Sequence, residues 1–81
     1  MSPADVESGV KGVISNCLHV PVEQLHSGTT WADLKADSLS RIEVTLVLED
    51  TFKLIVPDEE AAKFQTLADV VAYIHGHLPP P

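Results

Sequence analysis

Hydrophobic residues recur with the spacing of an α-helix along most of this chain. In the first segment the apolar positions fall on one side of a helix with 3.6 residues per turn: Val6, Val10, Val13, Ile14 and Cys17. Ser2 can cap this helix, Pro3 suits its first position, and Asp5 lies in the first turn, where the helix dipole favours an acid. The sequence therefore predicts a helix that begins at Pro3 and ends at or before Val20-Pro21.

A second helix is expected over residues 38–52, where neither Gly nor Pro interrupts the chain and Asp37 is a good N-cap. This helix has two apolar faces, of which one is made by Val44, Leu48 and Phe52. The other face has three aliphatic residues and an acidic rim: Leu39, Ile42 and Leu46, with Glu43, Glu49 and Asp50. A small bundle normally buries one face of each helix. The second face is therefore either covered by the preceding loop or open for a partner.

The connection before this helix, residues 20–36, is rich in turn-forming residues and has no sustained period. A loop of this length in a small domain is usually pinned to the core or functional. Four large apolar side chains are expected to pin it: Val22, Leu25, Trp31 and Leu34. The spacing from Trp31 to Leu34 indicates a single helical turn that directs both side chains inward.

Two further helices are expected after Pro57, which ends any helix that precedes it. Asp58 can cap a short helix over residues 59–63. Thr66, followed three residues later by Asp69, resembles a capping box for a longer fourth helix. The apolar face of that helix is made by Leu67, Val70, Val71, Ile74 and Leu78.

The fourth helix is expected to stop at Gly76 and at the prolines of positions 79–81, which form a disordered tail or a boundary. Three longer helices and one short helix predict an all-α, four-helix bundle with a long loop between the first two helices. A chain of 81 residues is expected to be a single domain, residues 1–81.

Charge narrows the class of partner. Twelve acids stand against five bases, for a net charge of −7, so binding to nucleic acid phosphates is not expected. Acidity suits partners with basic docking patches, and the simpler interpretation is that it only confers solubility. No apolar run is long enough to span a membrane and no secretion signal precedes the first helix. A cytoplasmic location is therefore expected.

Residues 34–39, Leu-Lys-Ala-Asp-Ser-Leu, resemble the attachment motif of acyl carrier proteins. The triplet Asp-Ser-Leu alone is a weak signal, but here it stands after a long loop, at the start of a long helix in a small acidic chain. The flanks resemble the same family over nearly the whole chain, at residues 42–43, 48–52, 55–61, 66–70 and 73–74.

In that family the serine of the triplet receives 4′-phosphopantetheine, whose terminal thiol holds acyl groups as thioesters. The resemblance implies that Ser38 carries the arm, with Asp37 and Leu39 beside it in the motif that a phosphopantetheinyl transferase reads. It also maps a partner-recognition surface onto the second helix: Leu39, Ile42, Glu43, Leu46, Glu49 and Asp50. Acyltransferase and ketosynthase-type enzymes of fatty-acid or polyketide biosynthesis are the implied partners of a monomeric carrier.

A helix N-terminus stabilises the negative charge of a phosphodiester, which is compatible with this assignment. The simpler interpretation is a serine that only begins a helix. Three positions depart from the family pattern: Lys35 where Gly is usual, Ser40 where an acid is common, and Arg41 where a small residue is common. Lys35 affects the geometry of the loop, whereas Ser40 and Arg41 make the start of the recognition helix less acidic and favour a polyketide or other specialised pathway. Arg41 either extends outward to solvent or narrows the entrance to an internal chain pocket.

Support for catalysis by the chain itself is weak, so a carrier and not an enzyme is expected. Ser38 lacks a Gly-x-Ser-x-Gly elbow, no Gly-rich phosphate loop is present, and the four histidines are distant from Ser38 in sequence. Cys17, the single cysteine, is expected to pack in the core, and no metal site is expected. Two alternatives stay open: a peptidyl or aminoacyl carrier of a nonribosomal pathway, and a helical interaction module without a prosthetic group.

Overall fold

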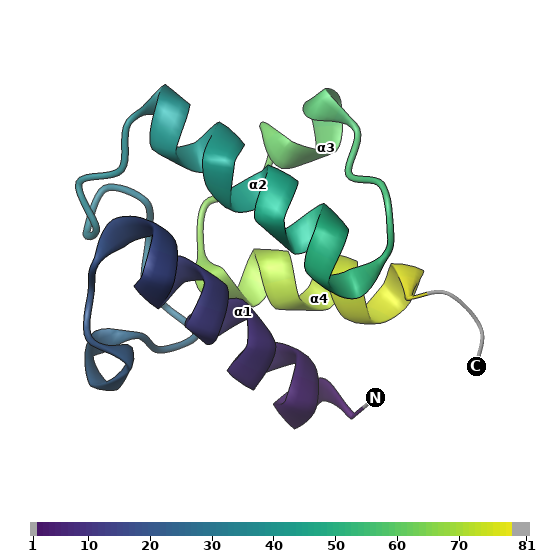
Figure 1. Ribbon diagram of the computed structural model, residues 1–81, viewed down its shortest axis with the longest axis horizontal. Coiled ribbons are helices and arrows are strands. Elements are labelled where there is room, and N and C mark those ends of the chain that lie inside the picture. The colour runs from purple at the N-terminus through teal and green to yellow at the C-terminus, as the bar shows by residue number, and fades with distance from the viewer. Residues whose placement is uncertain (1, 79–81) are drawn as a thin grey trace.

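The computed structural model describes residues 2–78, and the predicted tail at 79–81 lies outside the described residues. The elements along the chain are α1 (Pro3–Leu18), the short 3-10 helix η1 (Val22–Gln24), α2 (Ser38–Phe52), α3 (Asp58–Ala61) and α4 (Leu67–His77). Within the described range the backbone pairs extended segments only at an isolated bridge between Thr30 and Thr66. The predicted all-α fold of three longer helices and one short helix is confirmed (Figure 1).

Helix α1 packs against both α2 and α4, and the long loop occupies the end of the bundle where α1 finishes and α2 begins (Figure 1). At the start of α1, Ser2 and Asp5 form a reciprocal capping box. The buried core draws on every long helix and on the connections between them: Val6, Val10, Val13, Ile14, Leu25, Val44, Leu48, Phe52, Val56, Phe64, Leu67, Val70 and Ile74. Periodicity predicted most of these positions, because each long helix buries one stripe.

The long loop is held to the core by three of the four expected side chains. Leu25 is buried, and Trp31 and Leu34 are half-buried against the core. The predicted single turn is confirmed, since the Leu34 and Ala36 N–H groups donate to the Trp31 carbonyl oxygen at 3.2 and 3.0 Å. The prediction for Val22 was wrong: its side chain is 46% exposed. Val22 opens the 3-10 turn η1, which buries none of its residues, and Leu25 just after that turn takes the core position.

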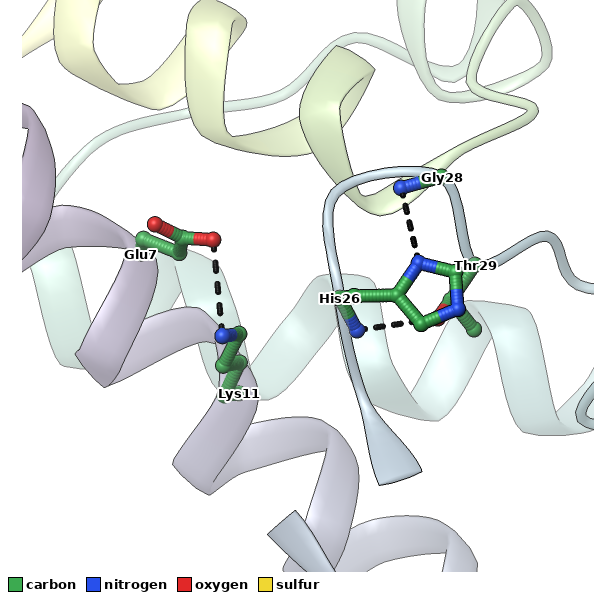
Figure 2. Close-up of polar contacts among 5 residues, drawn as sticks. All are labelled: Glu7, Lys11, His26, Gly28 and Thr29. Atoms are coloured by element: carbon green, nitrogen blue, oxygen red, sulfur yellow. Dashed lines mark hydrogen bonds and ion pairs between the residues drawn. The ribbon is translucent and has the colours of Figure 1, made fainter. Parts of the chain in front are cut away.

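Hydrogen bonds also attach the loop to the first turn of α4. The Leu67 N–H donates to the Thr29 carbonyl oxygen at 2.8 Å, and the Ala68 N–H donates to the Ser27 carbonyl oxygen at 2.9 Å. Thr29 is buried, although its side chain is polar. Figure 2 shows how its hydroxyl accepts from the His26 N–H at 3.0 Å, while the Gly28 N–H donates to His26 Nδ1 at 3.2 Å. The loop therefore provides acceptors for two of its own amides and for the first two amides of α4.

The ends of the two C-terminal helices differ from the prediction. Pro57 is the N-cap of α3, so the helix begins at Asp58 and ends at Ala61 instead of covering residues 59–63. Asp58 therefore is not a cap but the first helical residue, where the helix dipole favours an acid. Gly76 does not stop α4, because it keeps helical geometry without a positive φ and the helix continues to His77. The capping box of Thr66 with Asp69 is confirmed.

Candidate functional site

Ser38 is exposed at the first position of α2, and Asp37 is the N-cap of the same helix. Asp37 Oδ1 accepts a hydrogen bond from the Ser40 N–H at 2.8 Å. Hydrogen bonds from the Ser40 backbone and hydroxyl hold the pKa of the Asp37 carboxyl below its usual value. Asp37 is thus charged at neutral pH. The side chain next to it, Ser38, is exposed at the surface.

The N-termini of α2 and α4 differ in the way their backbone amides are satisfied. In α4 the Leu67 and Ala68 amides donate to loop carbonyl oxygens, and the Asp69 amide donates to the Thr66 hydroxyl. In α2 the Ser38 N–H donates to no acceptor within residues 2–78. This amide is available for an anion attached to the adjacent hydroxyl, and the helix dipole stabilises negative charge at the same point. The site therefore fits a phosphodiester on Ser38 Oγ.

The loop before Ser38 contains a residue with left-handed backbone geometry. Lys35 has a φ of 55°, in the region where Gly is favoured over residues with a Cβ. The turn is closed around it, because the Lys35 N–H donates to the Ala32 carbonyl oxygen at 3.1 Å. The chain thus keeps at Lys35 a backbone conformation that suits the Gly usual in fatty-acid carriers.

The second apolar face of α2 is open, and the long loop does not cover it. Leu39, Ile42 and Leu46 are 65%, 56% and 58% exposed, so the structure decides between the two alternatives that periodicity left. Val47 and Ile55 are also exposed large hydrophobic residues, and the sequence pattern did not identify them as part of a surface. Ile55 follows α2 in the connection to α3, where no helical period applies.

The acidic rim of this face is less uniform than predicted. Glu43 and Asp50 are exposed, but Glu49 is half-buried and its Oε2 accepts a hydrogen bond from the Val56 N–H at 2.7 Å. Glu49 therefore links α2 to the segment that leads into α3. Asp50 pairs with Lys53 at 3.6 Å on the surface. Among the rim acids, Glu43 has neither an ion pair nor a hydrogen-bond donor in residues 2–78.

Arg41 joins three parts of the chain that are far apart in the sequence. Its Nη2 donates to the Phe64 carbonyl oxygen at 3.2 Å, and the same oxygen accepts from Trp31 Nε1 at 3.1 Å. The guanidinium carbon also lies 5.5 Å from the centre of the Trp31 ring, within the range of a cation–π contact. Arg41 thus does not simply extend to solvent. Sequence reasoning missed this contact, since nothing in the local pattern brings positions 31, 41 and 64 together.

A groove of about 570 Å³ runs between α2 and α3, which lie next to one another in Figure 1. Its wall includes Ser38 and Arg41 together with apolar side chains of both helices. Arg41 therefore borders the groove. Ser38 and the groove share one side of the molecule.

Other reactive side chains are separate from Ser38. Burial and, to a lesser extent, the charge of Glu43 raise the pKa of the Cys17 thiol, which keeps it protonated at neutral pH. His77 Nδ1 lies 2.8 Å from the Tyr73 carbonyl oxygen in the last turn of α4. In residues 2–78 no three His, Cys, Asp or Glu side chains cluster as metal ligands would. Over the same residues, each helix is too short or too polar to traverse a lipid bilayer.

Comparison with known proteins identifies the class. Residues 8–74 match the family model described as "Phosphopantetheine attachment site", which defines the chain as a carrier domain whose cofactor is 4′-phosphopantetheine. An acyl carrier protein from Akkermansia muciniphila is 41% identical over 75 residues, which cover 91% of this chain and 94% of that protein. An acyl carrier protein from Helicobacter hepaticus is 39% identical over 74 residues, covering 90% and 97%.

A solved structure of the acyl carrier protein from Enterococcus faecalis superposes with a TM-score of 0.78 at 35% sequence identity, covering 94% of this chain and 98% of that one. The chain belongs to the acyl carrier protein family. This confirms the resemblance drawn from the sequence. Carriers of this family act together with partner enzymes, so the exposed face of α2 is a candidate surface for their binding.

Proposed function

We propose that Ser38 is the residue that bears 4′-phosphopantetheine, and that the arm presents acyl groups as thioesters to enzymes of fatty-acid or polyketide biosynthesis. One observation carries the proposal: within the family motif, an exposed hydroxyl stands at the first position of α2, beside a backbone N–H that no protein acceptor uses. In the attachment step the Ser38 oxygen bonds to the phosphorus that carries the pantetheine of coenzyme A. The bond to adenosine 3′,5′-bisphosphate breaks, and the hydroxyl proton is released.

The chain's own residues would hold and display the arm and leave the chemistry to partners. The Ser38 N–H and the first turn of α2 stabilise the phosphodiester charge. Asp37 fixes the start of the helix through Ser40 and, with Leu39, forms the motif that the transferase reads. The bound arm supplies a thiol on a long tether, so a cargo attached to it reaches a partner's active site at high local concentration.

The same proposal covers the partners and their location. We expect a phosphopantetheinyl transferase, acyltransferases and ketosynthase-type enzymes to dock basic patches on the exposed α2 face, in the cytoplasm. The chain's net charge of −7 supports an electrostatic approach, and the exposed aliphatic residues supply contact area once docked. Catalysis by the carrier itself and a metal site are not part of the proposal, and we expect a monomer.

The test is intact-mass spectrometry after incubation with coenzyme A and a broad-specificity phosphopantetheinyl transferase. The wild-type protein should gain one phosphopantetheine, and Ser38→Ala should gain none. Ser40→Ala, two residues further in the same helical turn, is the matched control and should be modified like the wild type. Absence of an adduct on wild-type protein with a transferase that modifies another carrier would overturn the proposal.

The class of cargo is tested separately. The names of the relatives support an acyl carrier over a peptidyl or aminoacyl carrier. Loading of the modified protein by acyl or malonyl transferases is therefore expected, and loading by adenylation enzymes is not. Aminoacylation at a comparable rate would instead favour the nonribosomal role.

A further inference from the structure

Arg41 is the one basic residue among the described residues that line the groove between α2 and α3. It follows Ser38 by three residues, so the two side chains lie on the same side of α2. The Phe64 carbonyl oxygen and the Trp31 ring hold its guanidinium in place, at 3.2 Å and 5.5 Å. The orientation of the cation is therefore set before any cargo enters the groove.

Arg41 has no carboxylate partner in the described part of the chain, although the protein contains twelve acids. The ion pairs among residues 2–78 all use lysines: Lys11 with Glu7, Lys53 with Asp50, and Lys63 with Glu60. A guanidinium has five N–H donors. In Arg41 the Nη2 atom donates to the Phe64 carbonyl oxygen. Arg41 thus keeps hydrogen-bond donors at the groove that the described residues do not use.

The rest of the groove wall is mixed in character. Ile42 and Leu46 contribute apolar surface, and Thr45, Glu49 and Asp58 contribute polar surface. A saturated acyl chain against the guanidinium would displace water from its donors and return no hydrogen bond, which costs free energy. A carbonyl oxygen on the chain would accept that hydrogen bond.

A negatively charged cargo fits this wall less well than a neutral one. A carboxylate would be attracted by Arg41 but would meet two carboxylates, Glu49 and Asp58, in the same groove. A neutral ketone meets no such repulsion. The charges of the groove wall therefore favour a cargo with neutral carbonyl oxygens over a cargo with a carboxylate.

We propose that Arg41 is a specificity-determining residue that makes the groove favour acyl chains with oxo groups over saturated acyl chains of equal length. This inference rests on the proposed function, because the chain must reach the groove from an arm on Ser38. The substrates of this site are then partly unreduced acyl thioesters that carry oxo groups.

The experiment loads the protein from octanoyl-coenzyme A or 3-oxooctanoyl-coenzyme A with a transferase, and intact mass first confirms one acyl arm. Exchange of each acyl group onto a small thiol, 2-mercaptoethanesulfonate, which spares the ketone, is then compared with that of the same acyl pantetheine free in solution. The oxo chain should be protected about fivefold or more relative to the octanoyl chain, in keeping with a charge-assisted hydrogen bond. Trp31, the single tryptophan, contacts Arg41, so its fluorescence should change more with the oxo cargo.

Arg41→Met removes the donors and keeps side-chain length, and its two protection factors should agree within about twofold. Lys53→Met removes a positive charge outside the groove wall and should keep the wild-type preference. Should Arg41→Met fail to fold, the Arg41 Nε–H resonance of the wild type decides, since it should shift with the oxo cargo and not with octanoyl.

Equal protection of the two cargoes in the wild type, or an unchanged preference in folded Arg41→Met, would overturn this inference and leave the proposed function intact. If Arg41→Met does not fold, an Arg41 Nε–H resonance that does not shift with the oxo cargo would likewise overturn the inference. Failure to form the acyl adduct at all would instead overturn the proposed function, and the inference with it.

Discussion

Among single residues, Lys35 shows how backbone geometry constrains the loop before Ser38. A side chain with a Cβ is strained at a φ of 55°, and Gly is not. The turn nevertheless forms here, because it is closed by backbone hydrogen bonds and anchored by Trp31 and Leu34. The chain tolerates local strain next to Ser38 because its neighbours determine the conformation.

Lys35→Gly should therefore raise the free energy of unfolding by about 0.5–1 kcal/mol, the relief of strain less the greater flexibility of Gly in the unfolded chain. Urea denaturation followed by circular dichroism measures this change. Lys35→Ala is the control and should bring no comparable gain, because Ala keeps the Cβ. An equal gain from Lys35→Ala would show that strain at φ is not the cause.

Among the elements, helix α4 depends on a reciprocal cap. Asp69 Oδ2 accepts from the Gln65 and Thr66 amides at 2.9 and 3.1 Å, and these hydrogen bonds hold the pKa of the Asp69 carboxyl below its usual value. The folded chain therefore binds this proton more weakly than the unfolded chain. The stabilisation is present above the ordinary Asp pKa of about 3.9 and is lost as the pH falls through the lower, folded value.

Asp69→Asn should accordingly flatten the acid limb of the stability profile. Between about pH 5 and pH 2.5 the free energy of unfolding should fall less steeply in the variant than in the wild type. Denaturant titrations at several pH values provide the measurement. Glu59→Gln removes an exposed acid with no ion pair in residues 2–78 and serves as the charge-matched control. Identical acid limbs in wild type and Asp69→Asn would contradict this prediction.

The contact between α1 and α2 is close at Gly9, where an added Cβ would lie 2.7 Å from Cζ of the buried Phe52 ring. At Gly12, one turn later in α1, an added Cβ would meet no atom within 4 Å. The two glycines share a helix but not a packing environment. Gly9 permits the helices to approach, and Gly12 only weakens the helix.

Gly12→Ala should stabilise the protein by about 0.5–1 kcal/mol, through helix propensity. Gly9→Ala gains the same propensity but must displace a buried ring, and should destabilise by about 1 kcal/mol overall. Thermal unfolding of the two variants gives the comparison. A stabilised Gly9→Ala protein would mean that Phe52 moves without cost.

Across the whole molecule, α2 turns one face to the core and its second apolar face, the proposed partner surface, to solvent. Helix α1 packs on α2 and α4 (Figure 1). The outward face of α2 and the groove toward α3 remain accessible. Within the described chain, exposed aliphatic residues gather beside Ser38 on α2, while the overall charge is negative. Such a surface combines long-range attraction of basic partners with short-range apolar contact.

Leu46→Ala should lower kcat/KM for modification by a phosphopantetheinyl transferase by up to about tenfold, the effect of losing one apolar anchor. Raising the salt concentration should lower kcat/KM further, because it screens the charge attraction. Val22→Ala removes a comparably exposed aliphatic side chain from the long loop and should have little effect. Equal losses in both variants would place the transferase contact elsewhere.

Local chemistry made the helices and the attachment motif readable from the sequence. Asp37, Thr66 and the apolar stripes act within a few residues of themselves, so capping and periodicity predicted α2 and α4 closely. Where local signals compete, prediction failed: Pro57 displaced Asp58 as the cap of α3, and the helical context of α4 outweighed Gly76. The motif at Ser38 was likewise visible, because it is contiguous.

The sequence by itself therefore determined the helices, the capped start of α2 and the residues of its second face. Tertiary structure alone decided that this face is open, that Val22 is exposed, and that Glu49 bonds to Val56. It also brought Arg41 to Phe64 and Trp31 at the groove. These outcomes depend on contacts between residues that are distant in the chain. The sequence pattern gives the spacing of nearby residues, but it does not give the way in which the helices pack on one another.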